Sequence, residues 1–158
     1  MLKPKLISLS MAGILAFILI CPAAMAQGYS DSPGYSGITL GSGGHWFSLL
    51  GLNYLSIGEG EQVGFHAGAG YAYGLAASAG AVFRLSDNGG IYTTYHYLSL
   101  DKSLFGVNVG KDPASASLVS VTYGAIPKDK SEFMWDVGVG YLLDPSAVVA
   151  MLGLGVSF

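Results

Sequence analysis

Residues 133–158, FMWDVGVGYLLDPSAVVAMLGLGVSF, decide the fold of this chain. Asp144-Pro145-Ser146 divides the stretch into two segments. In each segment large apolar or aromatic residues occupy every second position, and most of the positions between them hold small residues. An alternation of period two is the signature of a β-strand with two unlike faces. The stretch therefore predicts two strands, each with one face of large apolar side chains.

The same alternation recurs upstream, between breaks that carry charges, prolines and the run Asp87-Asn88-Gly89-Gly90. Proline cannot donate to a β ladder and belongs in turns or at sheet edges. The eight segments that the pattern predicts as strands are 45–57, 61–73, 75–85, 91–101, 104–110, 115–126, 132–143 and 146–158. The face assignment is unclear in the first of them, and 104–110 is short.

The small residues and the large ones lie on opposite faces, and this decides which face meets the solvent. An eight-stranded barrel has a narrow interior, so small residues fit inward and large apolar residues outward, against lipid. Closure of the barrel leaves no unpaired backbone in hydrocarbon, and bacterial barrels have even strand numbers. We predict an all-β protein, an eight-stranded antiparallel transmembrane β-barrel with up-and-down meander topology.

A helical alternative rests on residues 62–83, which carry no charge and contain glycines that could form small-residue contacts between spanning helices. The density of glycine and aromatic residues there, and Gly74 where a tight turn is needed, favour strands over helices.

The first residues predict a cleaved Sec-type signal peptide. Lys3 and Lys5 precede an apolar run at 11–20, and Ala24-Met25-Ala26 provides a small-residue cleavage site. A retained anchor is the alternative, but the apolar run is short for a spanning helix. A lipoprotein signal ending before Cys21 is a second alternative, although Ile20 stands where a small residue is needed. The predicted domains are a signal peptide at 1–26, a flexible periplasmic leader at 27–44 and the barrel at 45–158.

The leader, residues 27–44, is of low complexity and poor in apolar residues, which favours flexibility. A speculative alternative is that it folds back into the glycine-lined lumen as a plug.

The last strand carries a family resemblance. The chain ends in Phe158, preceded at every second position by Val156, Leu154 and Leu152. This resembles the C-terminal targeting strand of Gram-negative outer-membrane β-barrels. The resemblance implies location in the outer membrane, these four residues as the assembly signal, and contacts with periplasmic chaperones and the barrel-assembly machinery during biogenesis. It also implies outer-membrane lipid as the surroundings of a protein that we expect to be monomeric.

The charge balance argues against a nucleic-acid partner, and the cysteine and histidine content argues against a metal. The chain has seven basic and ten acidic residues, and two of the basic residues belong to the predicted signal. Nucleic-acid binding needs a basic stripe, so no nucleic-acid partner is expected. The one cysteine also lies in the signal, and the three histidines lack paired ligand spacing. We therefore expect no metal and no cofactor.

Three polar residues fall within strands on the predicted inward face: His66, Arg84 and Asp136. Glu61 lies near the same mouth of the barrel. We interpret the four as a lumenal polar network in which Arg84 pairs with Glu61 and charge is kept away from lipid. The alternative is a polar constriction or a small ligand pocket.

The function predicted from these patterns is non-catalytic. With both termini periplasmic, the outer loops would be 58–60, 86–90, 111–114 and 144–146, all shorter than the loops that adhesins display. A nucleophile, a base and an orienting group must meet for triad chemistry, and the local pair His96 and Ser99 has odd spacing and so points to opposite faces. We predict no catalytic residues and a structural or narrow-pore (porin-like) protein of the cell envelope. The alternative is a lipid-modifying enzyme acting on lipid A or phospholipid.

Overall fold

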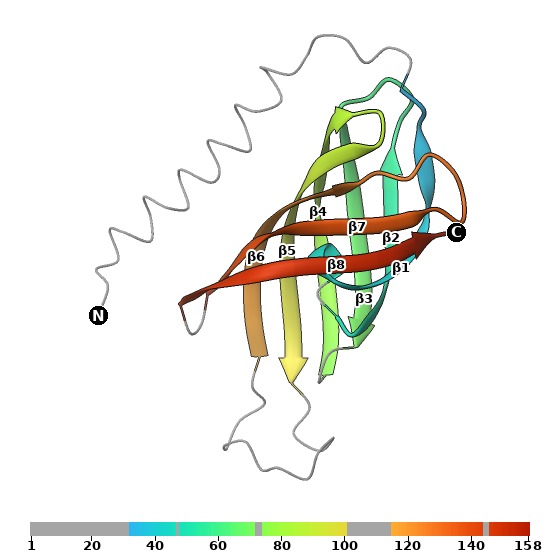
Figure 1. Ribbon diagram of the computed structural model, residues 1–158. Coiled ribbons are helices and arrows are strands. Elements are labelled where there is room, and N and C mark those ends of the chain that lie inside the picture. The colour runs from blue at the N-terminus through green and yellow to red at the C-terminus, as the bar shows by residue number, and fades with distance from the viewer. Residues whose placement is uncertain (1–31, 47, 72–73, 101–114, 144–145) are drawn as a thin grey trace.

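The computed structural model describes residues 32–46, 48–71, 74–100, 115–143 and 146–158. The described chain forms eight strands and one short 3-10 helix. Their bounds are β1 Tyr35–Gly43, η1 Gly44–Trp46, β2 Leu50–Ile57, β3 Val63–Tyr71, β4 Gly74–Ser86, β5 Gly89–Leu100, β6 Ser115–Ala125, β7 Phe133–Leu142 and β8 Ala147–Ser157. Each strand pairs antiparallel with the next, and β8 pairs with β1, so the sheet closes into a barrel (Figure 1). The predicted eight-stranded antiparallel meander is confirmed.

The period-two pattern sorts side chains between the two faces of the barrel wall. On β7 and β8 the outward residues Val137 and Leu152 are 50% and 66% exposed, whereas the inward residues Met134 and Met151 are buried. The other strands follow the same rule, and each has at least one large apolar or aromatic side chain on the outer surface. On β5 and β6 these side chains are the tyrosines Tyr95, Tyr97 and Tyr123. The outside of the barrel is therefore apolar, as a surface facing lipid must be. Among the described residues, no helix has the length and hydropathy to cross a membrane.

Several predicted boundaries differ from the structure. The predicted flexible leader 27–44 is wrong from Tyr35 onward, because Tyr35–Gly43 is β1. The predicted strand 45–57 begins only at Leu50, because η1 occupies its first positions. The predicted signal peptide and the predicted strand 104–110 lie outside the described residues. The ring of eight strands is complete without 104–110, since β5 pairs directly with β6.

Because β1 was not predicted, the connections after β2 and after β4 lie at the opposite end of the barrel from the predicted one. We call the end of the barrel that holds Tyr35 and Ser157 the terminal end, and the opposite end, where β1 stops at Gly43, the loop end. Strand order places residues 58–62 and 87–88 at the terminal end. The prediction of outer loops at 58–60 and 86–90 was therefore wrong, because adding a strand before them exchanges the ends at which they lie.

The pairing of β1 with β8, which we call the seam, is short. It runs over five residue pairs, from Thr39↔Ser157 to Gly43↔Gly153, whereas β4 and β5 pair over twelve. At Gly43 the chain leaves the wall of the barrel, and β8 continues past it toward Ala147. Figure 1 shows β8 crossing obliquely toward β1, with its first half extending away from that strand.

The orientation of the wall gives a first prediction. Val137→Arg, outward at the middle of β7, should lower the free energy of unfolding in phospholipid vesicles by about 2–4 kcal/mol, because a cation at the bilayer midplane is costly. Val148→Arg, outward near the loop end of β8, should cost about 0–1 kcal/mol because it reaches the interface. Urea unfolding followed by heat-dependent gel mobility measures both. Equal losses at the two positions would contradict the predicted placement in the bilayer.

Candidate functional site

The lumen of the barrel is entered from the loop end by the chain itself. After β1, Gly43 and Gly44 have φ angles of +71° and +46°, which favour glycine, and they turn the chain inward. The N–H of Gly43 donates to the carbonyl of Ser48 at 2.8 Å. The chain therefore leaves the wall of the barrel at Gly43 and returns to the same point at Ser48. We call this segment, Gly43–Trp46 together with Ser48, the inward loop.

Glycines on the neighbouring strands make room for the inward loop. A Cβ on Gly41 of β1 would overlap the indole of Trp46, and one on Gly155 of β8 would lie 2.7 Å from it. A Cβ on Gly51 of β2 would overlap the Ser48 hydroxyl. The Trp46 indole N–H donates to the Thr39 hydroxyl at 3.1 Å. The glycine-lined face predicted from the sequence therefore holds Trp46 and Ser48, which the sequence pattern had assigned to the strand 45–57. The inward loop, which begins within the last two residues of the predicted leader, occupies this face, and residues 27–31 of the leader lie outside the described residues.

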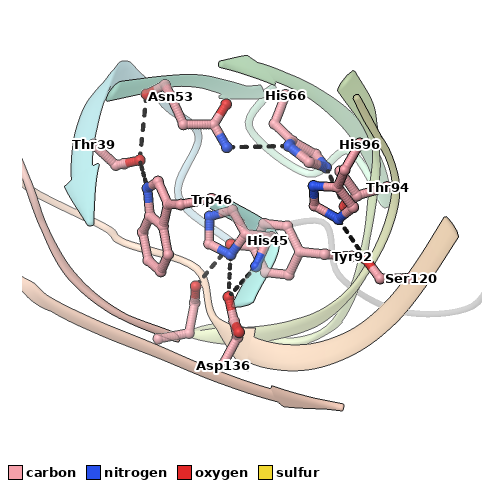
Figure 2. A network of polar contacts seen from close by, with 11 residues as sticks. Thr39, His45, Trp46, Asn53, His66, Tyr92, Thr94, His96, Ser120 and Asp136 are labelled. Carbon is pink, nitrogen blue, oxygen red and sulfur yellow. Dashed lines mark hydrogen bonds and ion pairs between the residues drawn. The ribbon is translucent and has the colours of Figure 1, made fainter. Parts of the chain in front are cut away.

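Asp136 of β7 fastens the inward loop to the wall. Its Oδ2 accepts a hydrogen bond from the backbone N–H of His45 at 3.0 Å and contacts Nδ1 of the His45 ring (Figure 2). Gly44 and Gly153 lie directly against the carboxylate, where side chains would collide with it. Asp136 and His45 are both buried. The acidic group is thus enclosed and paired, as an acid within a membrane-spanning wall would need to be.

Aromatic contacts complete the seat of His45. Its ring stacks on Tyr92 of β5 with centroids 4.4 Å apart and an interplanar angle of 7°. Trp46 lies 3.7 Å from the same ring, measured between centroids. The Tyr92 hydroxyl donates to the carbonyl of Ala125 at 2.7 Å, so the one polar atom of this buried side chain is satisfied.

His66 links three strands across the lumen. Its Nδ1 lies 3.2 Å from Nδ2 of Asn53 on β2, and its Nε2 lies 3.1 Å from the hydroxyl of Thr94 on β5. Gly80 of β4 stands opposite His66, and a Cβ there would lie 2.8 Å from Nε2, so the glycine lets the imidazole reach over β4. The predicted inward placement of His66 agrees with this position.

His96 and Ser120 form a second lumenal pair. His96 Nε2 and Ser120 Oγ are 2.8 Å apart, and both residues are buried. The sequence offered Ser99 as the serine nearest to His96, but Ser99 lies on the other face of β5, and Ser120 was not predicted. The signal that could have found it is parity, because Ser120 lies at an inward position of β6, the strand that pairs with β5. Asp136, the nearby acid that could orient a histidine, is engaged by His45.

The predicted pairing of Arg84 with Glu61 is wrong. Arg84 is buried, as predicted, but its guanidinium donates to the carbonyl of Pro33 at 2.7 Å. Glu61 is exposed and accepts a hydrogen bond from the N–H of Gly58 at 3.1 Å. Residue 33 had been assigned to the flexible leader, so the sequence offered no reason to place its carbonyl at the terminal end of the lumen. Glu61 therefore leaves the lumenal network, and His66, Arg84 and Asp136 lie within the barrel.

The terminal end of the lumen is filled by apolar side chains. The buried cluster consists of Tyr35, Trp46, Leu55, Ile57, Val82, Tyr92, Ile126 and Met134. It meets the polar network at Trp46 and Tyr92, which belong to both. The lumen is therefore apolar at the terminal end and polar in the middle. The inward loop lies between the polar part and the loop end.

The three histidines lie close together in space although they are distant in sequence. Figure 2 shows His45, His66 and His96 around the same part of the lumen, and the rings of His45 and His66 are 5.6 Å apart between centroids. The lack of paired ligand spacing in the sequence gave no sign of this proximity. Among the residues that the structure describes, no group of three His, Cys, Asp or Glu side chains is arranged to hold a metal ion.

The predicted assembly signal lies on the outer surface. Leu152, Leu154, Val156 and Phe158 all face outward, with exposed fractions from 36% to 66%. Their exposure fits a lipid-facing strand, and their reading by an assembly machinery stays a prediction.

Comparison with known proteins adds a likeness of fold. No family model matches the chain, and no curated protein matches it. Among solved structures, the chain is similar to the backbone structure of the Yersinia pestis outer membrane protein Ail in a phospholipid bilayer nanodisc. The two are 18% identical with a TM-score of 0.44, and the match covers 79% of this chain and 99% of that one.

The contact between Asp136 and His45 generates a second prediction. Asp136→Ala should lower the free energy of unfolding by about 3 kcal/mol, because it leaves a buried partner without its acceptor. His45→Ala should also destabilise, and in the double variant the two losses should fall short of additivity by about 1 kcal/mol or more. Unfolding in urea measures the cycle. Glu61→Ala, an exposed carboxylate, is the control and should change little, and full additivity of Asp136→Ala and His45→Ala would refute the coupling.

Proposed function

We propose that this protein is a structural β-barrel of the Gram-negative outer membrane whose lumen is closed to ions. The proposal rests on the filled lumen. The inward loop packs against a buried polar network, and the apolar cluster fills the lumen between this network and the terminal end. A narrow pore, the other form of the predicted function, would need a continuous polar path. The apolar cluster at the terminal end interrupts such a path.

Placement in the membrane is supported by the two faces of the wall. Apolar side chains cover the outside, and the charged residues of the strands, Arg84 and Asp136, lie inside with their partners. A soluble barrel would reverse this arrangement, because water favours polar groups outside. Assignment to the outer membrane follows from the resemblance of the last strand and from the predicted signal peptide. No partner is required for these roles beyond lipid and the biogenesis factors.

The proposal predicts silent bilayer recordings. The wild-type protein in planar lipid bilayers should give no steady ionic current. The double variant Trp46→Ala/Tyr92→Ala should give a measurable current, because it removes the two large side chains shared by the network and the apolar cluster. Trp135→Ala, which removes an outward tryptophan, is the matched control and should stay silent. Heat-dependent gel mobility verifies that each variant folds, and discrete current steps from the wild type would reject a closed lumen.

A second candidate function is lipid modification, which the contact of Ser120 with His96 favours. A serine hydroxyl within hydrogen-bond reach of an imidazole is the start of an activated nucleophile. Against it stand the complete burial of both residues and the engagement of Asp136 by His45. Mass spectrometry of lipids from cells that produce the protein distinguishes the two functions. Altered lipid A or phospholipid that returns to normal with Ser120→Ala and with His96→Ala would favour the enzyme over the structural barrel.

A further inference from the structure

The inward turn of the chain leaves an opening in the wall of the barrel. Beyond Gly43↔Gly153, no strand among the described residues pairs with β8 on the side of β1. A pocket of about 260 Å³ lies at this place. Its lining consists of Gly43, Gly44, Leu118, Leu142, Val149, Ala150, Met151 and Leu152.

The lining shows that the pocket follows the edge of β8. Neighbouring residues of a strand point to opposite faces, so four consecutive residues, 149–152, can line one pocket only along the edge of the strand. Ala150 and Leu152 face outward, whereas Met151 is buried on the lumenal face. The pocket therefore connects the outer surface with the loop end of the lumen through the gap beside Gly43 and Gly44.

The surface around the opening is apolar. Val148 and Leu152 on β8 are 73% and 66% exposed, and Leu49 and Leu50, on the far side of the gap, are 59% and 61% exposed. In a barrel placed as proposed above, these residues meet lipid, with Val148 at the interface and Leu152 deeper in the bilayer. What stands in front of the opening is then lipid, and the side chains that line its interior are aliphatic or methionine.

The edge of β8 also carries polar backbone groups that need partners. The N–H of Phe158 donates to the carbonyl of Ile38 on β1 at 2.8 Å, which fixes the residues of β8 that point to the seam. Backbone groups of alternate residues point to the same edge, so Val148 and Ala150 direct their N–H and C=O groups into the gap. Unpaired backbone groups in hydrocarbon cost several kcal/mol, and donors at this edge suit the ester oxygens of a lipid.

We infer that this opening is a seat for one acyl chain of a bilayer phospholipid, with the chain between Gly43 and Met151 and its ester near the edge of β8. The volume exceeds the roughly 150 Å³ of a cavity that takes up benzene, so it holds several methylene groups. A zwitterionic phospholipid is favoured over lipid A because the residues that line the opening carry no charge. The phosphate of such a phospholipid is balanced by its own ammonium group, whereas the phosphates of lipid A need cations from elsewhere.

Two methionines make the inference testable. Met151 and Met134 are both inward and both buried, but only Met151 lines the opening. The full chain is reconstituted in phosphatidylcholine vesicles that contain a phospholipid with a diazirine in its acyl chain, irradiated, and mapped by mass spectrometry. We expect adducts on Met151 at a level comparable with outward Leu152, and none on Met134.

Blocking variants separate the opening from general contact with lipid. Val149→Phe fills the pocket from the lumenal side and should abolish labelling of Met151 while Leu152 stays labelled. Val148→Phe makes the same change one position away, on the outward face, and should leave labelling of Met151 unchanged. If Val149→Phe does not fold, Leu142→Phe narrows the pocket from β7 and should have the same effect.

The inference rests on the proposed membrane placement, and the labels distinguish the two. Labelled Leu152 with unlabelled Met151 would overturn the acyl-chain seat and leave the embedded barrel intact. Absence of label from both would show that the barrel does not lie in the bilayer, and both proposals would fail. Loss of Met151 labelling on addition of unlabelled lipid A, with Leu152 still labelled, would overturn the assignment to phospholipid.

Discussion

In a barrel proposed to face lipid, backbone N–H and C=O groups must find partners within the protein, and the other features of the fold follow from this constraint. A sheet satisfies it only by closing on itself, because an open edge would leave a row of donors and acceptors unpaired. With eight strands the closed sheet encloses a narrow interior, which has space for glycine and little else opposite a bulky neighbour. The inward loop exploits that limit, because glycines at 41, 51 and 155 leave room for Trp46 and Ser48.

The fold could be predicted from the sequence where one face of a strand is uniform. In β7 and β8 every outward position except Ala150 holds a large residue, and both strands were predicted to within a few residues. β1 lacks that signal, because Tyr35–Gly43 mixes glycine and serine with few apolar residues. It holds its place through pairing with strands on both sides, which no local pattern reveals. The error in strand count then exchanged the ends of the early connections.

The sequence predicted which residues face the lumen, but it did not predict which residues they contact. Alternation placed His66, Arg84 and Asp136 inside the barrel, since parity alone decides the face. Their partners are His45 from a segment that leaves the sheet, Pro33 from before the first strand, and Thr94 from two strands away. Each of these depends on register or on a non-repetitive turn. The expected Arg84–Glu61 pair failed because residues at one mouth of the barrel can lie on different sides of the wall, as buried Arg84 and exposed Glu61 do.

The position of the inward loop behind the seam has a consequence for the order of folding. β1 and β8 stand at opposite ends of the described chain, and the contact of Tyr35 with Phe158 spans 123 positions. Contacts of such long range carry the largest loop-closure entropy and form slowly. The inward loop begins at Gly43, which is also the last residue of β1 that pairs with β8. Closure of the barrel is then also the step that fixes the point at which the loop leaves the wall.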